Sequence, residues 1–330
     1  MQGNDDQSIW ALAALTAAER NFSQSSSTPS WSLLATNVFD TQVARWDTST
    51  CSGGLRWQIQ PFNNGYDYKN AIANGNFLQL AARLAHFTGN STYSNWAEKT
   101  FEWLQNVGFM TAQGVVYDGA YTTQNCSQVN ELQWSLNSGV LLYGSAVMYN
   151  VTNGNGTWHD RVTTLLSNIQ ATFFGKNIMI ETACEGADTC DTDNKFYKGI
   201  LARDMARTMV VAPFTESTIL PLLQSTGEAA AASGCADPNG TCGFVWTGST
   251  NNGTDLGSDY SALEAVLGNL VLAKTTLQNG NGTTEQGSGN STSGSSGSAP
   301  KQSAGVRTHS QRREVWWTAA IMLFICMQIV

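Results

Sequence analysis

The sequence predicts an all-α fold built from successive helix hairpins, and three observations point to it. Apolar residues recur at intervals of three and four through most of the chain, which is the spacing of one face of a helix. Short breaks that contain glycine, such as Thr88-Gly89-Asn90, separate neighbouring segments. Alternation of apolar and polar residues, the pattern of strands, is scarce. We therefore expect about nine helices and little sheet.

The helices are predicted in order along the chain. The first two occupy residues 5–20 and 31–45, and the next two carry the apolar stripes Phe77, Leu80, Ala81, Leu84 and Tyr93, Trp96, Ala97, Phe101, Leu104. Further helices are expected at 134–149, along the stripe Trp158, Val162, Leu165, Leu166, Ile169, at 199–212 and 216–232, and along the stripe Tyr260, Leu263, Val266, Leu267, Leu270. Loops alternate between short and long, and the long ones carry the aromatic and Asp/Asn clusters. This pattern favours a toroid of hairpins, although a plain bundle stays open because no strict repeat is visible.

Composition excludes some classes of partner. The 330 residues suffice for one large domain and a tail, and only 13% of them are charged. A net charge of −8 argues against nucleic acid, because a phosphate backbone needs a basic face. Eleven tryptophans and nine tyrosines either fill the core or line a carbohydrate cleft, where aromatic rings stack on sugar faces.

Cysteines and sequons predict an oxidising route. Six cysteines precede the apolar tail, and disulfides are favoured over zinc because no CxxC spacing occurs and the chain has three histidines. Close spacing and, for the last pair, elimination predict the bonds Cys184–Cys190, Cys235–Cys242 and Cys51–Cys126. Nine Asn-x-Ser/Thr sequons predict a glycoprotein, with glycans at Asn21, Asn90, Asn125, Asn150, Asn155, Asn239, Asn252, Asn281 and Asn290.

The C-terminal part predicts attachment of a glycosylphosphatidylinositol (GPI) anchor. Small residues begin at Ser303, a polar spacer covers 306–314, and an apolar stretch of sixteen residues covers 315–330. That stretch is short for a hydrocarbon core of roughly 30 Å, although a tail-anchored helix stays the alternative, and Gly297-Ser298-Ala299 is a second candidate attachment site. We therefore divide the chain into a folded domain at 1–278, a disordered Gly/Ser/Thr-rich linker at 279–302 and the attachment signal at 303–330.

The N-terminus lacks the matching entry signal. Residues 1–7 read Met-Gln-Gly-Asn-Asp-Asp-Gln, which is no signal peptide, whereas a GPI anchor is attached inside the secretory lumen. We therefore expect the chain to be truncated at its front.

Two adjacent carboxylates, Asp5 and Asp6, open the first predicted helix. One interpretation is capping of the helix dipole, worth about 0.3–1 kcal/mol each. The other is a glycosidase pair, in which one carboxylate is the nucleophile and the other the acid/base. Repulsion between the two would raise one pKa and keep that group protonated.

The blocks around this pair resemble glycoside hydrolase family 76, in its fungal cell-wall branch of mannan endo-1,6-α-mannosidase-like proteins. The resemblance covers residues 3 to about 272 and is carried by Gly3-Asn4-Asp5-Asp6-Gln7, Ala17-Ala18-Glu19-Arg20-Asn21-Phe22, Arg45-Trp46-Asp47, Cys51-Ser52-Gly53-Gly54-Leu55-Arg56-Trp57-Gln58, Gly65-Tyr66-Asp67-Tyr68-Lys69-Asn70, Val116-Tyr117-Asp118-Gly119 and Ser261-Ala262-Leu263-Glu264. It implies an (α/α)6 barrel in which Asp5 is the nucleophile and Asp6 the acid/base. It also implies a link to GPI-anchor glycans and to the cell wall. In the family a long segment precedes the pair, so the resemblance implies a domain that lacks its first helices here, and whose activity alone is in doubt.

Further candidates for sugar binding surround the long loops. They are Arg56, Trp57, Tyr66, Asp67, Tyr68, Asn70, Asp118, Trp134 and Asn137, each of which could instead be structural. The acids of the 188–193 loop are spaced as in some calcium loops but are usually just solvated. We expect no metal and no cofactor.

The favoured function is an anchored hydrolase or transglycosidase of α-1,6-mannan or GPI-anchor mannose glycans, on the secretory route to the plasma membrane and cell wall. A non-catalytic glycan-binding or adhesive surface protein is the alternative, and the Asp pair separates the two, because a binding module has no need for it. Another toroidal sugar enzyme, such as an epimerase, is disfavoured because the chain has only three histidines.

Overall fold

The computed structural model describes residues 3–235, 240–248 and 255–271, which all belong to one compact unit, Met1–Leu272. The predicted linker, the attachment signal and Ser303 lie outside the described residues, so they stay predictions.

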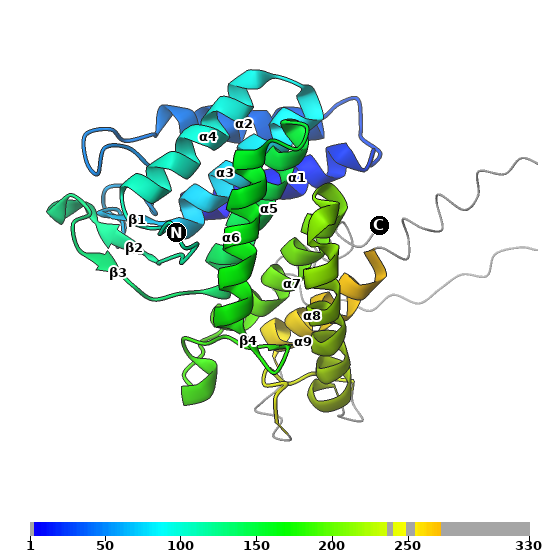
Figure 1. Cartoon of the computed structure of the whole chain (residues 1–330). Coiled ribbons are helices and arrows are strands. Elements are labelled where there is room, and N and C mark those ends of the chain that lie inside the picture. The colour runs from blue at the N-terminus through cyan, green and yellow to red at the C-terminus, as the bar shows by residue number, and fades with distance from the viewer. Residues whose placement is uncertain (1–2, 236–239, 249–254, 272–330) are drawn as a thin grey trace, which may run out of the picture. The chain divides into compact units, whose positions relative to one another are not determined.

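Helices dominate the described residues, as the periodicity predicts. They are α1 (Asn4–Glu19), α2 (Trp31–Ala44), α3 (Ala71–Thr88), α4 (Ser91–Asn106), α5 (Ser135–Val151), α6 (Gly156–Phe173), α7 (Asn194–Val211), α8 (Glu216–Ala229) and α9 (Leu256–Leu267). Each predicted helix is present, and α7 begins five residues earlier than expected because Asn194 and Asp191 bond to each other's backbone N–H groups at 3.1 and 2.9 Å. Figure 1 shows the helices as successive hairpins.

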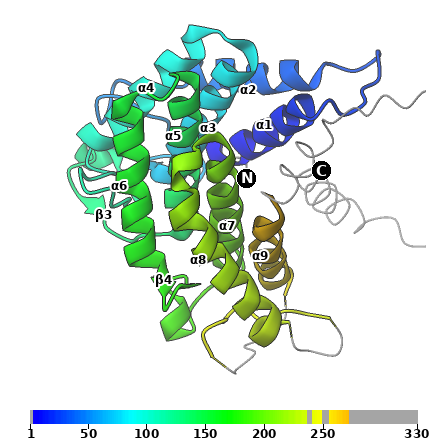
Figure 2. The same cartoon turned by 45° about the vertical axis from the view of Figure 1, so that its right-hand side comes forward.

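The helices form an inner and an outer series. Each odd-numbered helix packs against the next odd-numbered helix, from α1 through α3, α5 and α7 to α9. Nearly every residue of α3 and α5 is buried, whereas α6 buries one face that carries Trp158, Val162, Leu165, Leu166, Ile169 and Phe173. The even-numbered helices therefore lie outside the odd-numbered ones, an arrangement visible in the rotated view of Figure 2.

Side-chain caps fix where several helices begin. Ser30, Asn90, Asn155 and Asp255 each accept a hydrogen bond from a backbone N–H in the first turn of the following helix. Gly89 ends α3 with φ of 70°, the left-handed conformation that glycine adopts without a steric penalty. The Thr88-Gly89-Asn90 break is therefore a tight hairpin turn, as predicted.

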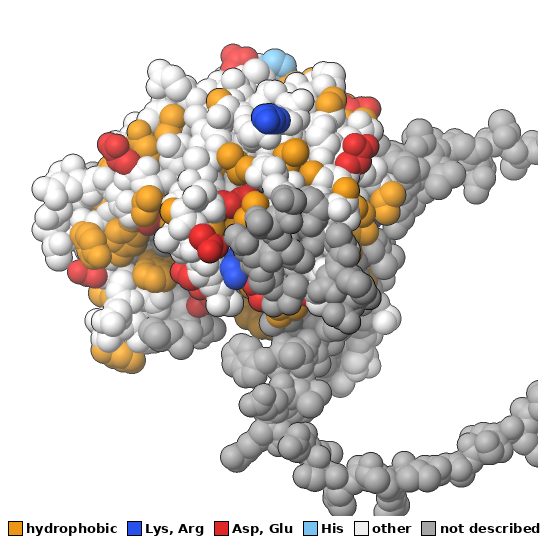
Figure 3. All heavy atoms as spheres, turned by 90° about the horizontal axis from the view of Figure 1, so that it is seen from below, with side chains coloured by type: hydrophobic (Ala, Val, Ile, Leu, Met, Phe, Trp, Pro, Cys, Tyr) orange, Lys and Arg blue, Asp and Glu red, His pale blue; other side chains and the backbone are white. Residues whose placement is uncertain are grey.

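Charged side chains are buried between the inner helices. Arg83 of α3 pairs with Glu19 of α1 at 2.6 Å, and Arg203 of α7 lies 3.7 Å from Glu264 of α9. Removing one partner of such a pair leaves an uncompensated buried charge, which costs about 3–5 kcal/mol. Charges are sparse on the described part of the surface seen in Figure 3, and no helix among the described residues is long and apolar enough to span a bilayer.

Short strands in the long loops were not expected. A three-stranded antiparallel sheet joins β1 (Tyr68–Asn70), β2 (Gly119–Tyr121) and β3 (Val129–Asn130), with Tyr68 opposite Tyr121 and Gly119 opposite Asn130. A second pair joins β4 (Phe174–Gly175) and β5 (Ile178–Met179). Strands of two or three residues are too short to show an alternating pattern, which is why the sequence missed them.

Candidate active site

The first turn of α1 is fixed to a loop segment more than fifty residues away. The backbone N–H of Asn4 donates to the carbonyl of Trp57 at 2.9 Å, and its side-chain amide donates to the carbonyl of Arg56 at 2.8 Å. Gly3 forms a bridge with Gln58, and a Cβ on Gly3 would lie 2.1 Å from an Asp5 carboxyl oxygen. A side chain at position 3 would therefore displace the Asp5 carboxylate, and the turn that holds Asp5 and Asp6 meets residues 56–58.

A second layer of polar side chains holds this turn from α2. The Gln42 amide donates to the carbonyl of Asn4 at 2.7 Å, and Ser8 donates to the same carbonyl at 2.9 Å. Arg45 donates to the Asn4 side chain at 3.0 Å and to Gln7 at 2.6 Å. Because Gln42 and Ser8 are fully buried, these bonds are costly to break and keep the turn rigid.

Asp5 and Asp6 lie in different surroundings. The Asp5 Oδ2 atom accepts a hydrogen bond from the Trp57 indole N–H at 2.9 Å, whereas its Oδ1 atom is buried without a hydrogen-bond partner. Asp6 is exposed, and its Oδ2 atom accepts from the Gly3 N–H at 2.7 Å. Burial, and then the charge of Asp6, raise the pKa of Asp5 to about 6, against the opposing effect of the Trp57 bond.

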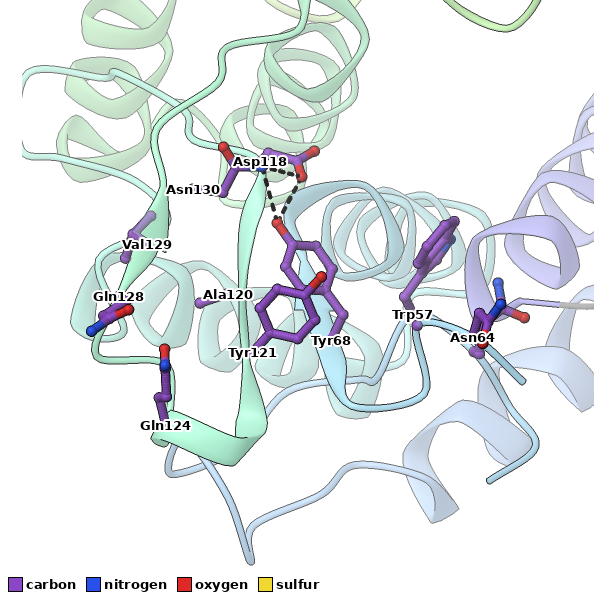
Figure 4. Close-up of a pocket in the computed structure, with 12 residues that line it drawn as sticks. Trp57, Asn64, Tyr68, Asp118, Ala120, Tyr121, Gln124, Gln128, Val129 and Asn130 are labelled. Carbon is purple, nitrogen blue, oxygen red and sulfur yellow. Dashed lines mark hydrogen bonds between the residues drawn. The ribbon is translucent and has the colours of Figure 1, made fainter. Parts of the chain in front are cut away.

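A pocket of about 1020 Å³ opens beside Trp57. The lining is uncharged apart from one acidic residue, and it includes three aromatic rings. It consists of Trp57, Gln58, Asn64, Gly65, Tyr68, Asp118, Ala120, Tyr121, Gln124, Gln128, Val129 and Asn130. Figure 4 shows Trp57 on one side of this group, with Gln124 and Gln128 on the other. Since Trp57 also binds Asp5, the carboxyl pair stands at the Trp57 side of the pocket.

Asp118 is the acidic residue of the pocket lining. Its Oδ2 atom accepts from the Tyr68 hydroxyl at 2.7 Å and from the Asn130 amide at 3.2 Å, as the dashed lines in Figure 4 show. Burial raises the pKa of Asp118, and Tyr68, Asn137, Asn130 and Trp134 act in the opposite direction. The predicted residues Tyr68, Asp118, Trp134 and Asn137 thus gather around one carboxyl group.

Four other predicted residues build the wall instead of lining the pocket. Arg56 forms an ion pair with Asp47 at 2.8 Å and stacks on the ring of Tyr66 at 4.7 Å. The Asp67 carbonyl accepts from the Thr122 N–H at 2.7 Å. Asn70 is buried, and its side-chain oxygen accepts from the Ala73 N–H and so caps α3.

The loop that carries Trp57 is held by the buried ammonium group of Lys69. Its Nζ atom donates to the carbonyl oxygens of Asp47, Thr50 and Gly53 at 2.8, 2.8 and 2.6 Å, and lies 3.2 Å from the Asp47 carboxylate. Burial lowers the pKa of Lys69 to about 8. This burial could not be predicted, because a lysine is normally expected at the surface.

The predicted disulfides are formed in the structure. Their Cα atoms are 5.4 Å apart in Cys51–Cys126, 4.9 Å in Cys184–Cys190 and 4.0 Å in Cys235–Cys242. The first of these joins the Trp57 loop to the turn after β2, next to the pocket. The described sequon asparagines are exposed, namely Asn21, Asn90, Asn125, Asn150 and Asn155; Asn239, Asn252, Asn281 and Asn290 lie outside the described residues.

Sequence reasoning missed the far wall of the pocket. Tyr121, Gln124, Gln128 and Asn130 come from β2, β3 and the turn between them, where no periodicity is visible. A usable signal was present in the sequence, namely the mostly polar run 121–131, which follows Asp118-Gly119 after one alanine and is interrupted only by Cys126 and Val129. Among the described residues no cluster of His, Cys, Asp and Glu is arranged to hold a metal.

The chain is similar to known glycoside hydrolases. The model of glycosyl hydrolase family 76 matches residues 1–281. A putative mannan endo-1,6-alpha-mannosidase of Schizosaccharomyces pombe is 43% identical over 318 residues, which are 93% of this chain and 71% of that protein. Mannan endo-1,6-alpha-mannosidase DFG5 of Saccharomyces cerevisiae is 43% identical over 271 residues, which are 81% of this chain and 59% of that protein. The chain thus spans between 59% and 71% of the length of these two relatives.

Solved structures agree on the fold. Dfg5 from Chaetomium thermophilum, in complex with glucosamine, is 41% identical with a TM-score of 0.79, over 82% of this chain and 69% of that chain. An inactive variant of an α-1,6-mannanase from Salegentibacter sp., in complex with α-1,6-mannotriose, has a TM-score of 0.69 over 82% of this chain and 77% of that chain. At 17% identity the second likeness concerns the fold alone. The expected (α/α)6 class is confirmed.

Proposed function

The chain belongs to glycosyl hydrolase family 76, and on that premise we propose that it is an endo-acting α-1,6-mannosidase or transglycosidase with Asp5 and Asp6 as its catalytic pair. One observation carries the proposal. Asp5 has one carboxyl oxygen held by Trp57 and the other without a hydrogen-bond partner, at the side of an aromatic and polar pocket. A nucleophile needs a fixed orientation, which the bond from Trp57 gives to the Asp5 carboxylate.

The proposed reaction is a double displacement. A carboxylate oxygen of Asp5 attacks the anomeric carbon of a mannose residue, while Asp6 donates its proton to the glycosidic oxygen and the leaving sugar departs. An ester then links the mannosyl group to Asp5. Asp6, now ionised, takes a proton from water or from a sugar hydroxyl, whose oxygen attacks the same carbon and frees Asp5. The exposure of Asp6 suits this exchange of protons.

The pocket suits a neutral polyol. Trp57 and Tyr121 keep 36% and 52% of their surfaces exposed, so both offer ring faces for stacking on sugar. Asp118, Asn130 and the glutamines of the far wall offer acceptors and donors for hydroxyl groups. The relatives named as mannan endo-1,6-alpha-mannosidases support α-1,6-linked mannose as the substrate, and the glucosamine bound by the Chaetomium protein supports a GPI-anchor glycan.

Substitution of the pair tests the proposal. Asp5→Asn and Asp6→Asn, introduced separately into the secreted protein, should each abolish cleavage and transfer of α-1,6-mannooligosaccharides while leaving thermal unfolding and oligosaccharide binding close to those of the parent. Asp160→Asn is the matched control, because Asp160 is an exposed carboxylate on α6. Normal rates in both site variants would remove the pair from catalysis and favour the glycan-binding alternative.

We also propose that the protein reaches the cell surface and is held there by a GPI anchor attached at Ser303. Support comes from the order of small residues, spacer and apolar tail. Phosphatidylinositol-specific phospholipase should release the protein from membranes, and the mature chain should lack residues 315–330. Recovery of those residues in the membrane-bound form would establish a tail anchor instead.

A further inference from the structure

One sequon lies between two residues that line the pocket. Asn125 follows the short helical turn Thr122–Gln124 and adopts φ of 49°, a left-handed conformation that asparagine tolerates. Its neighbours Gln124 and Gln128 both line the pocket. Asn125 itself is exposed, and Cys126-Ser127 completes its sequon.

The orientation of the Asn125 amide is fixed. Its Oδ1 atom accepts a hydrogen bond from the Cys51 N–H at 2.5 Å, and because a backbone N–H requires an acceptor, the oxygen must face Cys51. The Nδ2 atom therefore points away from Cys51. Nδ2 is the atom that N-glycosylation modifies, and the modified amide keeps its carbonyl oxygen. The bond to Cys51 and a glycan are thus compatible.

The other described sequons lie at the opposite ends of the helices. Helices α1, α3 and α5 begin on the pocket side, next to Asp5, β1 and Trp134, and run 16 to 18 residues, which is roughly 25 Å. The remaining asparagines lie at or just beyond the far ends of these helices, namely Asn21, Asn90, Asn150 and Asn155. Among the described sequons, Asn125 alone is on the pocket side.

We propose that Asn125 carries an N-linked glycan that stands at the end of the pocket opposite Trp57 and limits the length of the sugar chain that the pocket accepts. In the modification, Nδ2 forms a bond to the anomeric carbon of a lipid-diphosphate-linked oligosaccharide, the bond from that carbon to the phosphate oxygen breaks, and the lipid diphosphate leaves with the proton. The limit on chain length rests on the proposed function, whereas the glycan itself does not.

Two variants separate the glycan from the structural role of Asn125. Ser127→Ala abolishes the sequon but leaves the Asn125 oxygen on Cys51, so the secreted protein should lose one glycan and unfold at an unchanged temperature. Asn125→Gln removes both and should also lower the unfolding temperature. Thr92→Ala is the matched control, because it removes the sequon of Asn90 at the far end of α3 while keeping the Thr92 N–H that Asn90 caps.

Glycopeptide mass spectrometry of the secreted protein tests the site directly. A peptide with unmodified Asn125 would overturn the proposal, whatever the activity of the protein. For the effect on substrate length, kcat/KM is measured for long α-1,6-mannan and for mannotriose, and the two values are expressed as a ratio. If turnover is absent, the ratio of the two affinities is measured instead. The long-to-short ratio should rise in Ser127→Ala and stay constant in Thr92→Ala. An equal ratio in Ser127→Ala and the parent would refute the limit on chain length.

Discussion

Replacing Trp57 by phenylalanine should shift the pH dependence of catalysis. The substitution keeps an aromatic ring beside Gly65 but removes the indole N–H that binds the Asp5 carboxylate at 2.9 Å. A hydrogen bond to a charged group contributes about 1.5–3 kcal/mol, and 1.36 kcal/mol corresponds to about one pKa unit. Because Asp5 is partly exposed, we use the lower end, which is about one unit upward.

The sign follows from the role of Asp5. A nucleophile must be ionised, so kcat/KM is lost as pH falls through the pKa of Asp5, about 6 in the parent. In Trp57→Phe the loss should be centred near pH 7. At pH 6 the ionised fraction of Asp5 falls from about a half to about a tenth, so ionisation alone accounts for roughly a fivefold loss of kcat/KM, whereas at pH 8 it accounts for under about 10%. The smaller ring of phenylalanine changes stacking on sugar equally at both pH values.

The assay is kcat/KM for an α-1,6-mannooligosaccharide between pH 4.5 and 8.5, with a titration of the Asp5 carboxyl carbon by NMR as a readout that needs no turnover. Trp134→Phe is the control, since Trp134 faces Asp118 rather than Asp5. An acidic limb that does not move in Trp57→Phe would refute the proposed link between Trp57 and Asp5. A limb at which activity falls as pH rises through about 6 would assign Asp5 as the acid instead.

Two further predictions concern the pocket and its supporting loop. Tyr68→Phe removes the hydroxyl that donates to Asp118 at 2.7 Å, so the pKa of Asp118 should rise. The binding free energy for mannooligosaccharides, measured by calorimetry, should weaken by about 1–3 kcal/mol. Unchanged affinity would place the sugar elsewhere. Gly54→Ala puts a Cβ 2.2 Å from the Trp103 ring at a residue whose φ is 91°. The free energy of unfolding, measured in thermal melts, should therefore fall by about 1–3 kcal/mol. Gly186→Ala is the control, because the space around its new Cβ is open and the free energy of unfolding should change little.

The sequence predicted the helices well because their signal is repeated along each element. In the stripe from Phe77 to Leu84 an apolar residue returns to the same face of α3 at each turn, and all members of the stripe are buried. The Asp5–Asp6 turn was found through a local block of residues, and the structure places it against Trp57.

The pocket could be predicted only in part. Tyr68 and Asp118 were found because each lies in a distinctive block, whereas Gln124 and Gln128 face the pocket only because β2 and β3 pair. Pairing of two-residue strands depends on the tertiary fold, which short-range pattern does not contain. For Arg56 and Asn70 the choice between sugar binding and a structural role could not be made from the sequence, since the ion pair with Asp47 and the cap of α3 depend on the tertiary fold.

The position of Lys69 bears on how the Trp57 loop responds to its environment. Three carbonyl oxygens and a carboxylate converge on its ammonium group, which is the ligand set that a bound calcium ion would receive in an extracellular loop. Here the cation is covalently attached to β1, so its effective concentration is set by the chain and not by the medium. The loop that presents Trp57 should therefore keep its shape when the concentration of free ions changes, and a chelator should not alter it.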